Sequence, residues 1–285
     1  MTQRNLEPGE FEVSVEPRRV TLKEHGRRTV VAPFRDLAFE PMDIAFRAKV
    51  GKLVDGDPYL KDRLGLRVLH YAAHALTRVG EDDFAAMPIA KRVVEVGKMR
   101  LQDVIAMSYM RAAEEDEGHV EAELGGSCPH CGAELPRQVR VDVMGLGLWV
   151  WEDVPKLRYR LRRPWKCLGQ DVTEVTMEPP RLGPAVEKLS QGDFDNPIMS
   201  DLAWTAAAIT AVNGTPLVLT PAQLTQRDPA RGVGLSSGDF TAMRRAVDRV
   251  LLGAESVIGW RHEACGQDVP IILDWGQTFF GRSGA

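Results

Sequence analysis

Two series of hydrophobic and polar positions follow one another along the chain, and the order of the elements they predict is similar. In the first series, β-branched runs on either side of Gly26 predict a β-hairpin over 18–34. Apolar positions at helical spacing then predict helices over 41–54, 61–80, 89–96 and 99–116. Predicted strands flank the sequence "SCPHCGAELP" (127–136), at 119–124 and 137–143.

The second series begins over 157–177, where charged and apolar residues alternate and predict a hairpin that turns near Gly169. The elements predicted next are helices over 199–214 and from Ser237 or Gly238 onward, and strands over 255–261 and 269–275. Asn213-Gly214 is predicted to close the first of these helices. The last two strands flank "RHEACGQDVP" (261–270).

The two quoted sequences share one pattern. In each, a Cys or a His stands three residues before a Cys, Gly follows at once, and an acidic residue, an aliphatic residue and Pro come at equal offsets. Asp103 and Asp239 precede the two motifs at nearly equal spacing. We therefore predict an α+β fold of two divergent tandem repeats, 1–155 with a CxxC knuckle and 156–285 with an HxxC knuckle. Each repeat would comprise a β-hairpin, helices and a knuckle hairpin.

A strand, a CxxCG sequence and a second strand are typical of a zinc knuckle, in which a tight turn places two metal ligands side by side. Each knuckle supplies two ligands, whereas structural zinc takes four. The sequence thus predicts one shared, zinc-ribbon-like site that joins the repeats. Its structural Zn²⁺ would be bound by Cys128, Cys131, His262 and Cys265. Cys167 is the reserve ligand in place of His262, and is otherwise predicted to be a small buried residue.

Another interpretation makes Cys128 and Cys131 the redox pair of a thiol oxidoreductase. That chemistry favours a CxxC at a helix N-terminus, which lowers a thiol pKa, whereas predicted strands flank this one. His70 and His74 share a helix face but lack the Glu that a metalloprotease helix carries after its first His, so a helix surface explains them better.

Other motifs also have simpler explanations than catalysis. "GLSSG" (234–238) matches the hydrolase pattern G-x-S-x-G, but a polar turn precedes it instead of a buried strand. Ser236 and Ser237 are better explained as candidates for the N-cap of the following helix. The stretch "RYRLRRPWK" (158–166) is basic with interleaved aromatic residues, which suits a nucleic-acid-binding strand or an amphipathic strand with a solvated face.

The composition narrows the choice of function. The net charge of −4 provides no overall attraction to nucleic acid, so that partner is not favoured. The longest apolar run, 202–212, is about half the length of a membrane span, and the N-terminus carries no apolar secretory segment. A cytoplasmic protein with reduced thiols is predicted, in which CxxC favours a metal over a structural disulfide.

Asp103 and the segment 128–143 carry a resemblance to the baseplate hub assembly chaperones of contractile-tailed phages. The second half, over 161–180, 206–228 and 238–252, resembles the small tail assembly chaperones of phages and phage-derived injection machines. His262 departs from the CxxC expected of such a knuckle. The resemblance implies a non-catalytic assembly factor, not an enzyme, with no catalytic residues and no small-molecule substrate. Its expected partner is a hub or tape-measure protein, in the host cytoplasm if a phage encodes the chain; a zinc-ribbon nucleic-acid-binding protein is the alternative.

Overall fold

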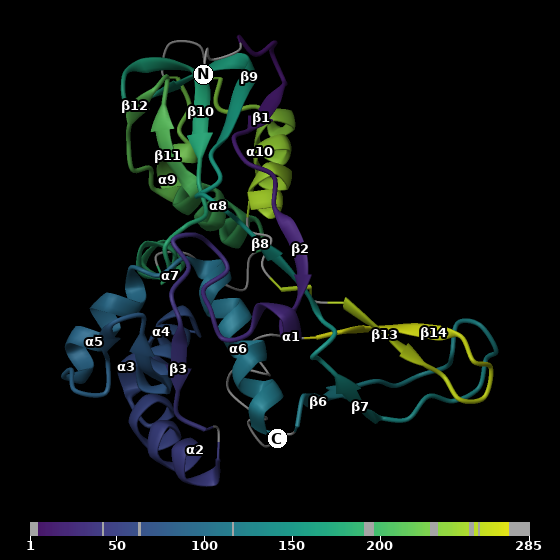
Figure 1. Cartoon of the computed structure of the whole chain (residues 1–285). Helices are drawn as coiled ribbons and strands as arrows, with labels where there is room; N and C mark the ends of the chain where they lie inside the picture. Colours follow the sequence, from purple (N-terminus) through teal and green to yellow (C-terminus); the bar gives the residue numbers. More distant parts are fainter. Residues whose placement is uncertain are drawn as a thin grey trace.

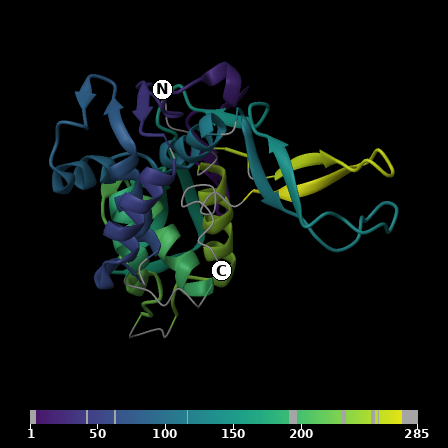
Figure 2. The same cartoon turned by 90° about the horizontal axis from the view of Figure 1, so that it is seen from below.

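The computed structural model of the chain describes residues 5–41, 43–61, 64–115, 117–190, 197–228, 233–250, 254–255 and 257–273. Over these residues the protein has a mixed α+β fold with several small antiparallel sheets. It contains two large hydrophobic cores, the larger drawn mainly from 22–151 and the smaller from 157–247. A slender arm projects from the side of the molecule (Figures 1 and 2).

The larger core is mostly helical. Its three-stranded sheet has the order β3 (Leu37–Phe39), β4 (Leu76–Val79) and β5 (Asp82–Asp83). Its helices are α2 (Ile44–Val50), which continues as the π-helix η1 (Gly51–Asp55), α3 (Pro58–Lys61), α4 (Leu64–Ala75), α5 (Ile89–Gly97) and α6 (Leu101–Glu115). The helix α6 passes through the core, where Val104 and Met107 are fully buried. The helices predicted over 41–54, 89–96 and 99–116 are confirmed within one to three residues.

The hairpin predicted over 18–34 does not form. The strand β2 (Arg18–Thr21) pairs instead with the distant β8 (Gly147–Val150), and α1 (Leu22–His25) follows β2 at once. Thr21 and Glu24 make a reciprocal capping box, in which each side chain accepts a hydrogen bond from the backbone N–H of the other. Because this local pair satisfies backbone donors at a helix start, the chain turns into a helix where the β-branched pattern suggested a strand.

A five-stranded antiparallel sheet carries the smaller core. Its strands lie in the order β1 (Phe11–Val13), β9 (Leu157–Cys167), β10 (Gln170–Met177), β11 (Ile209–Val212) and β12 (Thr215–Pro216). The accompanying helices are α7 (Leu182–Ser190), α8 (Pro197–Ala208), α9 (Pro221–Leu224) and α10 (Ser237–Val250). The predicted hairpin of β9 and β10 is confirmed, with its turn at Leu168 and Gly169. Two elements link the cores: β1 reaches β9 from the N-terminal part, and α7 packs against α4 and α5.

The helices predicted over 61–80 and 199–214 are both too long. The helix α4 ends at Ala75 and passes directly into β4, and α8 ends at Ala208 and passes directly into β11. Each new strand is followed by a tight turn with positive φ, at Gly80 in the first case and at Asn213-Gly214 in the second. Asn213-Gly214 therefore turns a hairpin between β11 and β12 and does not cap a helix, because three of the four residues before it, Ile209, Thr210 and Val212, are β-prone.

The pairing of β4 with β3 and the pairing of β11 with β10 show the same irregularity. A register shift lies beside Phe39, which pairs with Leu76, and beside Met177, which pairs with Ile209. The residue after each bulge, Glu40 or Glu178, donates its backbone N–H to the last carbonyl of the helix at 2.8 Å.

Two buried aspartates fix the starts of α6 and α10. Asp103 Oδ1 accepts the backbone N–H groups of Val30 and Val31 at 2.7 and 3.1 Å. Asp239 Oδ1 accepts the N–H of Arg162 at 3.0 Å and the phenol O–H of Tyr159 at 2.7 Å. Each carboxylate thus attaches its helix to a preceding extended segment. The N-cap predicted for α10 is confirmed at Ser236, whose Oγ accepts the N–H of Asp239 at 3.0 Å.

The arm consists of two antiparallel hairpins, β6 (His119–Glu123) with β7 (Gln138–Asp142) and β13 (Val257–Arg261) with β14 (Asp268–Ile272). These strands confirm the sequence prediction. The arm is attached to the larger core at its base, where Tyr109 donates its O–H to the carbonyl of Leu273 at 3.2 Å. Arg19 also makes two hydrogen bonds, of 2.7 and 2.9 Å, to the carboxylate of Glu255. Over the described residues, no helix combines the length and apolar character required of a membrane span.

Asp103 should make stability depend on pH. Burial opposes its charge more than the N–H groups of Val31 and Val30 favour it, which raises its pKa from 3.8 to about 6. The folded state therefore takes up a proton between about pH 6 and pH 4 that the unfolded chain does not. Relative to Asp103→Asn, which keeps an acceptor but does not titrate, the wild type should gain unfolding free energy as pH falls from 7 to 4. We expect a gain on the order of 2 kcal/mol, measured by chemical denaturation.

Asp239 provides a matched control of opposite sign. Burial raises its pKa, but the hydrogen bonds from Arg162, Ser236 and Tyr159 outweigh burial and lower the pKa below its ordinary value. Relative to Asp239→Asn, the wild type should lose stability as pH falls through 4. A pH-independent difference between the wild type and Asp103→Asn would contradict the assignment for Asp103.

Candidate metal centre

The two knuckles at the tip of the arm have the same backbone geometry. In the first, the N–H of Gly132 donates to the carbonyl of Cys128 at 2.9 Å; in the second, the N–H of Gly266 donates to the carbonyl of His262 at 2.7 Å. Both glycines have positive φ, +74° and +67°, which L-residues with a Cβ rarely adopt. The glycine after each knuckle is therefore required by the turn that brings its two ligands together.

The four predicted ligands converge between the two knuckles. Cys128, Cys131, His262 and Cys265 each offer one ligand atom, and all four atoms lie within 4.8 Å of one another. The Sγ atoms of Cys128 and Cys265 are 3.9 Å apart. His262 Nδ1 lies 3.5 Å from the Sγ of Cys131 and 3.3 Å from the Sγ of Cys265. This cluster can hold a metal ion.

These separations agree with tetrahedral coordination. With zinc bonds of about 2.3 Å to sulfur and about 2.0 Å to nitrogen, ideal ligand separations are roughly 3.8 Å for two sulfurs and roughly 3.5 Å for sulfur and nitrogen. The observed distances of 3.9, 3.5 and 3.3 Å lie within a few tenths of an ångström of those values. Three of the six separations thus fit an ion at the centre of the cluster, with Nδ1 as the histidine ligand atom.

The electrostatics of the cluster also favour a cation. Burial opposes ionisation of Cys128, but the backbone N–H groups of His130 and Cys131 and the adjacent thiols outweigh burial and lower its thiol pKa to about 6. The pKa of Cys131 is raised: the backbone N–H of Ala133 favours its thiolate, but burial and the sulfurs of Cys128 and Cys265 oppose it more strongly. A bound cation removes this repulsion, because each thiolate then binds positive charge.

A small apolar cluster supports the ligands. Leu135 and Val269, the aliphatic residues at equal offsets after the two knuckles, are buried together with Cys128. Trp260 packs at the edge of this cluster, and its ring lies 5.8 Å from that of His262. The shared aliphatic position thus has a packing role that sequence analysis did not assign. Its signal in the sequence was the equal offset of the two aliphatic residues after the knuckles.

His130 is a second residue that sequence analysis missed. Its Nε2 lies 3.2 Å from the carbonyl oxygen of Asp268, so the ring donates a hydrogen bond from the first knuckle to the first residue of β14. This contact joins the two hairpins independently of any ion. No local pattern could reveal it, because its partner is 138 residues away.

Cys167 is not near the cluster that the structure brings together. It is buried in the smaller core, on β9, where burial raises its thiol pKa. His70 and His74 lie half-buried on α4, and burial lowers the pKa of both imidazoles. Among the described residues, neither histidine belongs to a metal-holding group, and neither does Cys167.

The basic strand β9 is internal to its sheet, between β1 and β10. Tyr159, Leu161 and Trp165 are buried on its inner face. On the other face, Arg158 pairs with Glu174 at 2.8 Å and with Glu12 at 3.3 Å. The apolar and charged residues of β9 therefore alternate because one face of the strand is buried. Carboxylates on the neighbouring strands neutralise part of its positive charge.

Compared with protein-family models, with curated proteins and with solved structures, the chain matches none of them.

Substitution of the ligands gives a direct check on the site. The purified protein should retain about one metal ion per chain, because four ligands form one tetrahedral site. Cys128→Ala and His262→Ala should each release most of the metal, since either opens the coordination shell. Elemental analysis after dialysis against a weak chelator measures the retained metal.

Cys167→Ala is the matched control, because it removes a thiol that lies in the other core. It should cost packing energy of about 1 kcal/mol or more without changing the metal content. Retention of metal by His262→Ala together with its loss from Cys167→Ala would reverse the assignment of the fourth ligand.

Proposed function

We propose that the protein is a non-catalytic assembly factor of a phage tail or a phage-tail-like contractile injection system, stabilised by one structural zinc ion. The observation that carries the proposal is the convergence of Cys128, Cys131, His262 and Cys265 at the tip of the arm. Four protein ligands complete a tetrahedral shell and leave no position for a water or a substrate, which is the arrangement of structural zinc.

The donor set supports the choice of zinc. Three thiolates and one imidazole are soft or borderline ligands, which favour zinc over magnesium, calcium or manganese. Cys₃His is among the ligand sets of structural zinc sites. The ion would join the hairpin after α6 to the hairpin after α10, whose nearest ligands, Cys131 and His262, are 131 residues apart in sequence.

The proposal includes a duplication, with two divergent tandem repeats over 1–155 and 156–285. Several matched features support it: a helix that passes directly into a strand, the bulge opposite the start of that strand, and the positive-φ turn that follows. Asp103 and Asp239 start corresponding helices, and each accepts a backbone N–H two residues before a proline, from Val31 and Arg162. The two cores lie mainly on either side of the proposed boundary, with Leu182, Val186 and Ile271 of the second part joining the larger core.

The resemblance of the CxxC knuckle and its following strand to baseplate hub assembly chaperones supplies the biological role. The client would be a hub or tape-measure protein that is brought to an assembly-competent state. The metal-joined arm projects from the body and carries two hairpins whose outer strand edges pair with no further strand in the described part of the chain, which suits contact with an extended segment of a client (Figure 1).

Chelation should loosen both hairpins together. By analogy with a disulfide, closing a loop of this length stabilises the folded state by about 4–5 kcal/mol, because it lowers the entropy of the unfolded chain. The binding free energy of the ion adds to this stabilisation. Hydrogen exchange with and without chelator should show reduced protection in both β7 and β14, with α4 unchanged. Loss of protection in one strand alone would exclude a shared ion.

The assembly role predicts that genes for a hub and a tape-measure protein lie beside this one, and it is tested by co-expression with the proteins they encode. We expect one of them to co-purify with the chain in a stable complex, and His262→Ala to weaken that complex by disordering the arm. Absence of both complexes, together with a salt-dependent shift of labelled DNA or RNA, would instead support the alternative of a zinc-ribbon nucleic-acid-binding protein.

A further inference from the structure

The four ligands of the metal centre are not equally accessible to solvent. Cys128 and His262 are buried, with 2% and 6% of their surface exposed, and Cys265 is half-buried. Cys131 is the one exposed residue of the four. It is therefore the cysteine of the site that a reagent in solution reaches first.

A second sulfur lies within reach of Cys131. The four ligand atoms lie within 4.8 Å of one another, so the Sγ atoms of Cys128 and Cys131 are close together. The turn between them is closed by hydrogen bonds of its own: Gly132 donates its N–H to the carbonyl of Cys128 at 2.9 Å, and Cys128 donates its N–H to the carbonyl of Ala133 at 2.8 Å. These bonds hold the two cysteines side by side without any contribution from the second hairpin. An accessible cysteine next to a second cysteine is typical of redox-sensing thiols.

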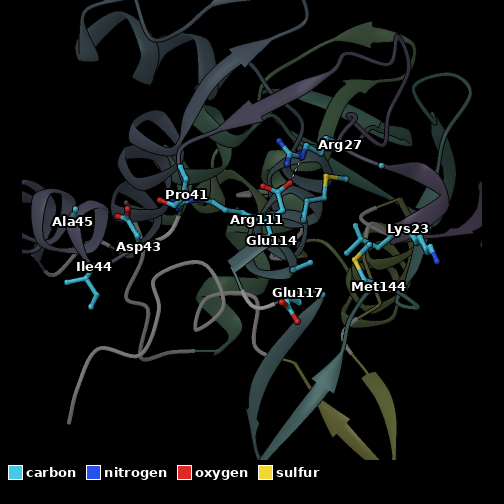
Figure 3. Close-up of a pocket in the computed structure, with 15 residues that line it drawn as sticks. Lys23, Arg27, Pro41, Asp43, Ile44, Ala45, Arg111, Glu114, Glu117 and Met144 are labelled. Atoms are coloured by element: carbon cyan, nitrogen blue, oxygen red, sulfur yellow. Dashed lines mark hydrogen bonds and ion pairs between the residues drawn. The ribbon is translucent and has the colours of Figure 1, made fainter.

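The base of the arm is held to the body by contacts that involve none of the four ligands. Met144, two residues after β7, accepts the backbone N–H of Lys23 at 3.1 Å, and both residues line a groove of the body (Figure 3). On the side of the second hairpin, Glu255 donates its N–H to the carbonyl of Gly147 at 2.8 Å. Loss of an ion from the tip would therefore leave both hairpins attached to the body.

We infer that the metal centre is also an oxidation site, at which a peroxide converts Cys131 and Cys128 to a disulfide and releases the ion. The inference rests on the proposed function in taking that ion to be structural zinc. It deepens the proposed function, because it makes the closed state of the arm depend on the redox conditions around the protein.

The reaction balances with hydrogen peroxide as the oxidant. The Cys131 thiolate attacks one peroxide oxygen and the O–O bond breaks, which gives a sulfenic acid and a hydroxide that takes up a proton to become water. The Cys128 thiolate then attacks the sulfenic sulfur. An S–S bond forms, the S–O bond breaks, and a second hydroxide leaves and is protonated. The two thiolates lose two electrons in total, and the peroxide gains them and becomes two waters.

Oxidation leaves an incomplete set of ligands. His262 and Cys265 remain, both from the second knuckle, and two ligands do not complete the shell of structural zinc. The tips of the two hairpins then keep the hydrogen bond from His130 to the carbonyl of Asp268 but lose their common ion. The arm would open at its tip on oxidation and close again on reduction in the presence of zinc.

The test treats the zinc-loaded full chain with hydrogen peroxide. A chromogenic chelator measures the zinc released, and peptide mapping under non-reducing conditions identifies the disulfides. We expect release of about one zinc per chain, together with one disulfide between Cys128 and Cys131. Dithiothreitol followed by zinc should restore the metal content. Cys167 should stay reduced, because it is buried in the smaller core.

Cys131→His and Cys265→His are matched variants. Each replaces one thiolate with an imidazole and leaves a Cys₂His₂ set, which also binds structural zinc. Cys131→His removes the accessible sulfur and should release zinc roughly tenfold more slowly than the wild type at the same peroxide concentration. Cys265→His keeps the Cys128 and Cys131 pair and should release zinc as fast as the wild type. Zinc content before peroxide is added detects a variant with a folding defect, and disulfide mapping of the wild type decides the question in that case.

Zinc retained in the presence of peroxide, zinc released without a disulfide, or a disulfide between any other pair of cysteines would overturn the inference and leave the proposed function standing. Equally fast release from the two zinc-loaded histidine variants would also overturn it. The expected release and disulfide, in a chain that forms no complex with a hub or tape-measure protein, would contradict the assembly role alone. A chain that binds no zinc would contradict both the inference and the structural zinc of the proposed function.

Discussion

The arm depends on the convergence of four ligands from two hairpins that are distant in sequence. At the knuckles, Leu135, Val269, Cys128 and His262 are buried, whereas the buried residues nearer the base of the arm, such as Val139 and Ile271, belong to the larger core. An isolated two-stranded hairpin is marginally stable in water. A tetrahedral ion bound by all four side chains would overcome this limit, because it would take two ligands from each knuckle and one hairpin could not satisfy it without the other. The hydrogen bond from His130 to the carbonyl of Asp268 sets the same pair in register.

Both hairpins follow helices whose starts are fixed by buried aspartates. Asp103 and Asp239 anchor α6 and α10 to the backbone at Val31 and Arg162. β6 begins four residues after the end of α6, and β13 begins seven residues after the end of α10. Contacts at the base of the arm, between Tyr109 and Leu273 and between Arg19 and Glu255, attach the arm to the body.

Local chemistry made much of the candidate site predictable. The CxxCG and HxxCG motifs specify tight turns, because Gly132 and Gly266 adopt positive φ and each turn presents two ligands on one side. Alternation of apolar and polar residues predicted the strands around them, and helical periodicity predicted α5, α6 and α10. The prediction that the two knuckles share one ion followed from the four ligands that structural zinc takes, since each knuckle supplies only two. The identity of the ion and the biological client are proposals that rest on this chemistry and on the resemblance.

The sequence by itself thus determined the ligands, the turns and the long periodic helices, because each depends on residues within a few positions of one another. The local capping box of Thr21 and Glu24 ends β2 before a hairpin can form, but tertiary structure alone decided that the distant β8 is the partner of β2. It also decided that α4 and α8 end early, because β4 and β11 gain neighbours in β3 and β10 that helical propensity does not register. The contact of His130 with the carbonyl of Asp268 is likewise a product of folding, because it joins two residues that lie far apart in the chain and no local pattern encodes such a contact.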